Sequence, residues 1–355
     1  MKYLPNLDFL RFILASLVIF YHVPQLCRNQ GLPYFLDAPI FNRGTEAVYM
    51  FFVLSGFLII RIIYRSKKRN TFSIKNFYLR RVLRIFPLYY LIVVFGFLFY
   101  WVVLPYLNIP FVNNYNLTEG LTLAVFFLPN VFEVMYKPGG ILEVLWSIGI
   151  EEQFYIVVAP LLFIVKKSWV LRSLLIITGI YFVIFHIEYF DLFIQFSMVY
   201  YLLFFGGIIA ILEEEKKLEF LKIHWMVPLV IVVFTVLYFS TSLFHFENIL
   251  IYNLITTVLF GLFIHTIAHN NHGVTLRSRI LNYLGQISYG IYMFHVVALN
   301  AVVFLFLKLQ LYELFNDTGI IILIYVVTFA LTIFIAHLSY KYFESYFLKL
   351  KNNFR

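Results

Sequence analysis

An apolar run at residues 7–22, LDFLRFILASLVIFYH, contains an arginine, Arg11, and a histidine, His22. Eleven residues of helix would separate them by about 16 Å along the axis and about 20° around it, so the two side chains would lie at two depths on one face. Ionisable residues inside a membrane segment are functional candidates by default, and a histidine is suited to act as a general base. The alternative is that Arg11 snorkels to one interface and that His22 lies at the other.

A second group of basic residues lies in FYLRRVLRIFPLYY, which contains Arg80, Arg81 and Arg84. Residues three apart lie on adjacent turns of one helix side, so Arg81 and Arg84 are expected to act together. Two guanidinium groups provide planar forks of donors that suit a phosphate-bearing ligand arriving from the cytoplasm. Attraction to anionic lipid headgroups would explain the same residues.

Two adjacent carboxylates occur in the apolar stretch LWSIGIEEQFYIVVAP, at Glu151 and Glu152. Ser147 and Tyr155 share the face of Glu151, at four residues before and after it. Buried carboxylates are costly in a membrane, which makes this pair a catalytic candidate. A structural ion pair is the competing interpretation.

Two further stretches place small or polar residues inside apolar segments. In AVYMFFVLSGFLI, Ser55 and Gly56 could permit close helix packing, or Gly56 could let the backbone approach a substrate. In ISYGIYMFH, the residues Ser288, Tyr292 and His295 follow one helix face. His295 could be catalytic, or it could be a core histidine whose hydrogen bonds are satisfied.

The elements that must position these residues are transmembrane helices. The chain has 355 residues, of which 62% are hydrophobic, 21% aromatic and only 13% charged. A soluble core of this size could not bury so much apolar surface, which indicates an integral membrane protein. The one cysteine, Cys27, excludes a disulfide within the chain and a cysteine-based metal site, and we expect no metal. The first apolar run lacks a cleavage motif, so we expect it to be retained.

Hydropathy and charge predict an all-α bundle of about ten transmembrane helices. The expected spans are residues 7–26, 44–64, 85–106, 143–165, 169–187, 192–212, 225–243, 248–268, 285–307 and 319–341. With the N-terminus in the cytoplasm, all but four of the 27 Lys and Arg residues fall on the cytoplasmic side. By the positive-inside rule, both chain ends are therefore expected in the cytoplasm.

Two segments are predicted to be helical without crossing the membrane. Residues 71–84 mix apolar and basic side chains, which indicates an interfacial helix on the cytoplasmic face, with Pro87 at the turn into the third span. Residues 118–129 are apolar but too short to span, and are expected to form a re-entrant or surface helix on the outer side. Residues 1–345 would form one transmembrane domain and residues 346–355 a short cytoplasmic tail.

In chain order, these stretches resemble the motifs of the acyltransferase 3 family, the multi-span O-acyltransferases of surface and secreted carbohydrates. Arg11 and His22 fit R-x10-H, FFVLSGFLI fits FFxLSGFLI, and the Arg80 stretch fits R-R-x-x-R-I-x-P-x-Y. WSIGIEEQFY fits WSLxxExxFY, and ISYGIYMFH fits SYxxYxxH. The departures at Ala47, Tyr49 and Gly149 touch no candidate catalytic position. The esterase-like extension of some relatives is absent, which implies a membrane-only form.

The resemblance implies an enzyme of the inner or plasma membrane that moves an acyl group, most often acetyl, from acyl-CoA to a sugar hydroxyl. Acyl-CoA would be a co-substrate, with no tightly bound cofactor. The partners would be a carbohydrate or glycolipid acceptor, the bilayer and polysaccharide-synthesis machinery, with no nucleic acid. His22 is expected to be the general base, made more basic by Glu151. The donor-binding residues would be Arg11, Arg80, Arg81 and Arg84. The site-shaping or substrate-binding residues would be Ser55, Gly56, Ser147, Tyr155, Ser288, Tyr292 and His295.

Several alternatives remain open at the level of sequence. Acyl transfer could be direct, or it could pass through a covalent intermediate on Ser55, Ser147, Ser288 or His22. A transporter or flippase for a lipid-linked sugar could use the same buried charges to line a pathway. A membrane scaffold with an inactive site is a third class. The identity of the acceptor and of the acyl group cannot be derived from these residues.

Overall fold

A computed structural model describes residues 4–222, 225–268 and 278–354, and within these ranges the chain is helical with no strand. The longer helices are α1 (Pro5–Asn29), α2 (Gly44–Lys68), α3 (Ile74–Leu98), α8 (Trp146–Ile164), α9 (Val170–Phe185), α11 (Tyr200–Glu214), α12 (Met226–Ser240), α13 (Ile249–Ala268), α15 (Ser288–Lys308) and α16 (Asp317–Ser339). The shorter ones are α4 (Leu104–Tyr106), α5 (Leu117–Val125), α6 (Pro129–Tyr136), α7 (Gly140–Glu143), α10 (Asp191–Gln195), α14 (Arg279–Gln286) and α17 (Ser345–Leu350). The all-α membrane bundle predicted from the sequence is confirmed.

Eight helical segments in the described ranges are long and apolar enough to cross a membrane. They correspond to the predicted spans that contain α1, α2, α3, α8, α9, α13, α15 and α16. Helix formation satisfies every interior backbone N–H and C=O within the segment itself, as hydrocarbon requires. Asparagine side chains cap two helix starts, because Asn116 accepts from the Glu119 N–H at 2.8 Å and Asn316 accepts from the Gly319 N–H at 2.9 Å.

The two remaining predicted spans differ from simple crossings. Residues 192–212 do not form one straight helix, because α10 and α11 are bent by 81° relative to each other. Ser197, between them, has a φ of +53°, a left-handed conformation that ends a right-handed helix. The span predicted at 225–243 is α12, an apolar helix of 15 residues, Met226–Ser240.

The turn predicted at Pro87 is wrong. One helix, α3, runs from Ile74 to Leu98 with Pro87 inside it, so the basic residues belong to the same helix as the third span. Proline fixes φ at a helical value and removes only one backbone donor, which packed neighbours can compensate. Ser73 caps this helix by accepting a hydrogen bond from the Asn76 N–H at 3.3 Å.

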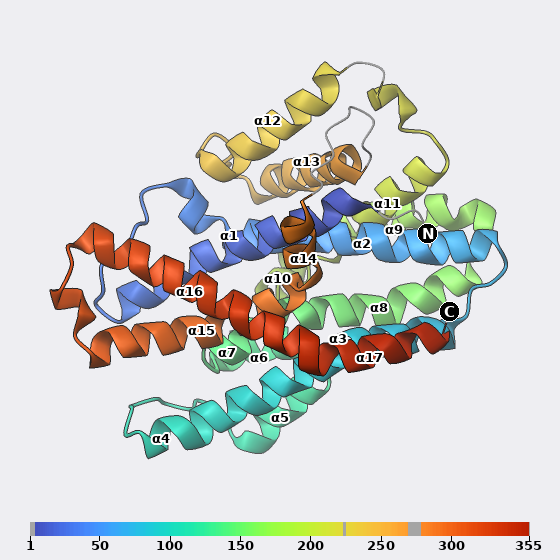
Figure 1. The fold of residues 1–355 in the computed structure, drawn as a ribbon. Coiled ribbons are helices and arrows are strands. Elements are labelled where there is room, and N and C mark those ends of the chain that lie inside the picture. Colours follow the sequence, from blue (N-terminus) through green and yellow to red (C-terminus); the bar gives the residue numbers. More distant parts are fainter. Residues whose placement is uncertain (1–3, 223–224, 269–277, 355) are drawn as a thin grey trace.

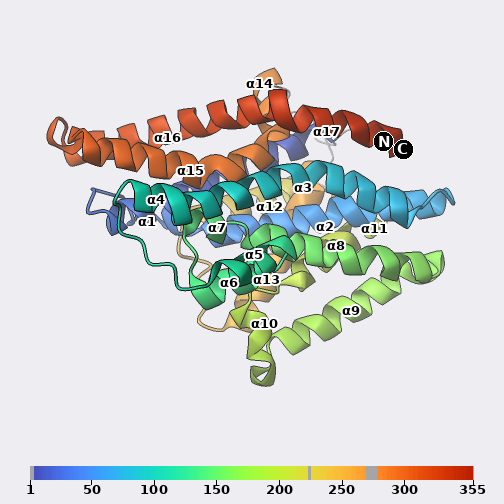
Figure 2. The ribbon, with the colours of Figure 1, turned by 90° about the horizontal axis from the view of Figure 1, so that it is seen from below.

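The outer segment predicted at 118–129 forms short helices that do not span. Helix α5 begins at Leu117 and ends at Val125, and Pro129 begins α6. Phe127, in the turn between them, has a φ of +57°. Helix α5 accepts a hydrogen bond from Tyr89 of α3 at the Ala124 carbonyl, and α6 packs beside α8 (Figure 2).

The long helices lie roughly side by side, and the two marked chain ends are at the same end of the bundle (Figures 1 and 2). This arrangement agrees with an even number of crossings. Helices α2 and α11 pack so closely that a Cβ added to Gly56 would lie 1.8 Å from the Leu203 carbonyl oxygen. Glycine permits this approach of two backbones. Residues 346–354 continue beyond α16 as part of α17 and a final turn.

Candidate active site

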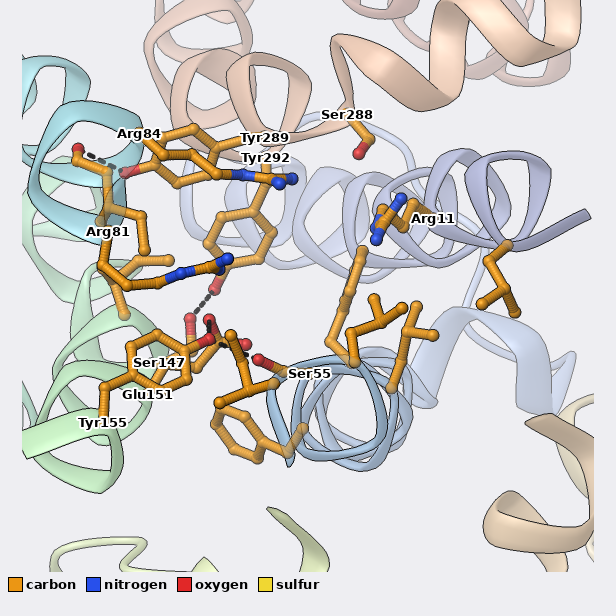
Figure 3. Close-up of a pocket in the computed structure, with 18 of the residues that line it drawn as sticks. Arg11, Ser55, Arg81, Arg84, Ser147, Glu151, Tyr155, Ser288, Tyr289 and Tyr292 are labelled. Carbon is orange, nitrogen blue, oxygen red and sulfur yellow. Dashed lines mark hydrogen bonds between the residues drawn. The ribbon is translucent and has the colours of Figure 1, made fainter. Parts of the chain in front are cut away.

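A cavity of about 430 Å³ lies among α1, α2, α3, α8 and α15. We call it the arginine cavity, because Arg11, Arg81 and Arg84 line it. The other predicted site residues that line it are Ser55, Ser147, Glu151, Tyr155, Ser288 and Tyr292. Thus residues from five stretches of sequence meet around one space (Figure 3).

The three arginines approach this cavity from two sides. Arg81 and Arg84 extend from the first turns of α3, and Arg11 extends from α1 opposite them (Figure 3). Arg11 forms an ion pair with Asp8 one turn earlier. The guanidinium of Arg81 lies over the Tyr155 ring, 5.9 Å from its centroid, and no described residue accepts a hydrogen bond from its buried Nε. The three arginines are therefore suited to bind an anion such as a phosphate.

Glu151 is held by hydroxyl groups of two helices. The Tyr155 hydroxyl donates to its carboxylate at 2.9 Å, as the spacing of four residues on α8 allows. Ser55 of α2 is hydrogen-bonded to the Tyr155 hydroxyl. Glu152 points elsewhere, because it is buried and does not line the cavity.

Tyr292 separates the arginine cavity from a second, larger one. Its hydroxyl donates to the Val144 carbonyl oxygen at 3.0 Å and lies 2.7 Å from the Ser147 hydroxyl. Because a carbonyl oxygen only accepts, the Tyr292 hydrogen is used there and Ser147 donates to Tyr292. Tyr292 and Val48 line both cavities, so they form the wall between them.

The second cavity has a volume of about 870 Å³ and is lined by His22, so we call it the histidine cavity. His22 is hydrogen-bonded to the Gln25 side chain, and its ring centroid lies 5.1 Å from that of His295. His295 donates from Nδ1 to the Tyr292 carbonyl, since that oxygen can only accept. No described residue is hydrogen-bonded to its buried Nε2.

Whether His22 touches Glu151 is left open by the sequence, and the structure places the two residues in different cavities. Glu151 lines the arginine cavity with Tyr155 and Ser55 as partners, whereas His22 lines the histidine cavity. The residue beside His22 is His295. Sequence spacing does not predict this pairing, because α1 and α15 are brought together only by tertiary packing.

Three predicted site residues line neither cavity, namely Arg80, Gly56 and His295, of which His295 lies beside His22. Arg80 lines neither, although it directly precedes Arg81. Gly56 faces α11 and packs against Leu203.

The structure adds residues that the sequence did not single out. Asp8 and Tyr289 line the arginine cavity, and Gln25 and Trp146 line the histidine cavity. The three-residue spacing of Asp8 and Arg11 was a usable signal, because residues so spaced meet on a helix. Tyr289 donates to the Ile85 carbonyl at 3.1 Å, a contact that only the packing of α15 on α3 creates.

Three relatives illustrate what this chain is similar to. A Staphylococcus aureus (strain COL) protein named "Putative O-acetyltransferase" is 24% identical over 389 residues, which cover 98% of this chain and 58% of the relative. The Peptidoglycan O-acetyltransferase OatA of Listeria monocytogenes is 29% identical over 174 residues, covering 48% of this chain and 25% of the relative. An uncharacterized protein of Haemophilus influenzae is 34% identical over 146 residues, covering 38% of this chain and 56% of the relative.

The chain thus spans a little more than half the length of the Staphylococcus and Haemophilus proteins, and a quarter of the length of the Listeria protein. No solved structure matches it. The model of a family described as an acyltransferase domain matches residues 4–337, which is nearly the whole chain. The chain belongs to the acyltransferase 3 family.

Proposed function

We propose that the protein is a membrane O-acyltransferase that moves an acyl group, acetyl in the simplest case, from cytoplasmic acyl-CoA to a hydroxyl of an extracytoplasmic or lipid-linked carbohydrate. The observation that carries the proposal is the pair of cavities that meet at Tyr292 and Val48. One is lined by three arginines and the other by a histidine. A donor with phosphates and an acceptor with a hydroxyl need these two different surroundings.

In this proposal, Arg81 and Arg84 hold phosphates of CoA, and Arg11 completes the positive set from α1. Arginine suits this role because its guanidinium is always charged and donates in a planar fork. The acyl end then points along the arginine cavity towards Tyr292. Arg80, which lines neither cavity, is left out of the donor site.

His22 is the general base in this proposal, in place of a dyad with Glu151. The acceptor oxygen bonds to the acyl carbon, the carbon–sulfur bond breaks, and the hydroxyl proton passes to the His22 imidazole. That proton then returns to the CoA thiolate, so CoA leaves as its thiol. Gln25 and His295 hold the His22 ring in place. The acyl carbon must pass the wall at Tyr292, so the Tyr292–Ser147 hydrogen bond opens during transfer.

The test is acyl transfer from radiolabelled acetyl-CoA to a cell-wall or lipid-linked glycan fraction by purified protein in lipid nanodiscs. His22→Ala should reduce transfer by about 100-fold or more, since a positioned general base contributes roughly that factor. His245→Ala is the matched control, because His245 is exposed and lines neither cavity.

Normal product formation by folded His22→Ala protein would overturn the assignment of the base. A wild-type protein that binds the glycan but never consumes acetyl-CoA would favour the carrier or flippase class instead.

A further inference from the structure

The two cavities differ in the sign of the charged groups that line them. Three arginines line the arginine cavity, beside the carboxylates of Asp8 and Glu151. The charged side chains of the histidine cavity are Glu133 and Glu143, and no Lys or Arg of the described chain lines it. The space assigned to the acceptor is therefore acidic.

These two carboxylates differ in their direct partners, because Lys137 pairs with Glu133 and acts on Glu143 only through the longer-range attraction of their charges. Glu133 forms an ion pair with Lys137 at 3.0 Å, which compensates its charge. Glu143 accepts a hydrogen bond from the Gly139 N–H at 3.3 Å, and no Lys or Arg in the described ranges forms an ion pair with it.

The uncharged part of the lining suits the rings and hydroxyls of a sugar. Trp146 and Tyr100 contribute aromatic surface, and Gln25, Asn29 and Asn300 contribute amides. An aromatic side chain offers a large flat apolar surface, which matches the C–H face of a pyranose ring. A side-chain amide both donates and accepts hydrogen bonds, which matches a hydroxyl group.

We propose that the acceptor sugar is uncharged or carries an amino group, and that Glu143 excludes sugars bearing a carboxylate or a phosphate. This rests on the proposed function, because it assumes that the acceptor occupies the histidine cavity. An anionic sugar would place two like charges together in a partly desolvated space, and like charges brought together in an interface disfavour binding. A neutral sugar avoids that repulsion, and an ammonium group would be attracted to Glu143.

The experiment uses a bacterial host whose surface polysaccharide contains both a hexose and a uronic acid. Cells with wild-type protein, with Glu143→Gln, with Glu133→Gln and without the protein are compared. Glycans are released under conditions that keep esters, and tandem mass spectrometry locates each acyl group on its sugar. Insertion of each variant is checked by size-exclusion chromatography of the fluorescently tagged protein.

The wild type should acylate the neutral or amino sugar at least about tenfold more than the uronic acid, which corresponds to roughly 1.4 kcal/mol. Glu143→Gln should reduce that preference strongly, and Glu133→Gln should reduce it less, because the ion pair with Lys137 already compensates most of the Glu133 charge.

Acylation of the uronic acid by wild-type protein at an equal level, or a preference unaltered by Glu143→Gln, would overturn the inference while leaving the acyltransferase function intact. Identical ester content with and without the protein would overturn the proposed function itself, and this inference with it.

Discussion

Arg80, Arg81 and Arg84 have the same side chain and lie within five residues, yet only two of them line the arginine cavity. Their directions follow from helical geometry, because residues three apart lie on one side of a helix and adjacent residues do not. The sequence therefore allowed the pair Arg81 and Arg84 to be predicted as a unit. Whether that side faced lipid headgroups or a cavity depended on the packing of α3, which spacing does not specify.

Replacing both arginines should selectively weaken donor binding. Arg81→Ala combined with Arg84→Ala removes two charge-assisted interactions of roughly 1.5–3 kcal/mol each, so the Kd for CoA should rise by at least about 100-fold. Isothermal titration calorimetry on protein in nanodiscs measures this directly. Arg80→Ala is the matched control and should leave the Kd within about threefold of the wild type. Wild-type affinity in the double variant would contradict the phosphate role.

For His22, the sequence predicts the position of the side chain but not all of its partners. Its position on the face of Arg11 could be derived from the eleven-residue spacing. Its partner Gln25, three residues later on the same helix, could also be derived from spacing. His295 could not, because it reaches His22 through a tertiary contact of α15. The carboxylate expected beside it, Glu151, is instead satisfied by the Tyr155 hydroxyl.

At the scale of elements, apolar length predicted the helices well, because backbone hydrogen bonding in hydrocarbon leaves the chain little choice. The exceptions have local causes. Pro87 was expected at a turn, but its fixed φ is compatible with the interior of α3. The bend of 81° between α10 and α11 arises at Ser197, whose left-handed φ no composition rule anticipates.

The contact of α2 with α11 gives a prediction at this scale. Gly56→Ala would place a methyl group 1.8 Å from the Leu203 carbonyl oxygen, so the helices would have to separate. Overpacking of this kind costs about 1–3 kcal/mol, and the thermal unfolding midpoint in detergent should fall. Gly179→Ala is the matched control, because an added Cβ there meets nothing within 4 Å. Where there is no clash, alanine is favoured over glycine in a helix, so the unfolding midpoint of Gly179→Ala protein should not fall. Equal midpoints for the two variants would show that α2 and α11 are not packed this closely.

At the scale of the whole molecule, the bundle forms two cavities of opposite chemical character with a shared wall. In the proposed function, this wall would keep the thioester of acyl-CoA in the arginine cavity from water in the histidine cavity. Tyr292 closes it through its bonds to Val144 and Ser147. No single segment of sequence predicted this arrangement, because the wall combines α2, α8 and α15.

Removing the Tyr292 ring should join the cavities. Tyr292→Ala is expected to raise hydrolysis of acetyl-CoA relative to acyl transfer, since water from the histidine cavity would reach the thioester. The ratio of free acetate to acylated glycan measures this effect. Ser197→Ala is a control, because Ser197 lines only the histidine cavity, away from the shared wall. An unchanged ratio in Tyr292→Ala would mean that this side chain does not separate donor from water.

In the proposed reaction, donor and acceptor approach the protein from opposite sides of the membrane. The most direct test reconstitutes the protein in vesicles in one orientation, with labelled acetyl-CoA on the side of Arg81 and Arg84 and the glycan acceptor enclosed on the other. Wild-type protein should form labelled glycan in the lumen, and His22→Ala protein should form none. Labelled glycan that forms only when acetyl-CoA and acceptor are on the same side would contradict it.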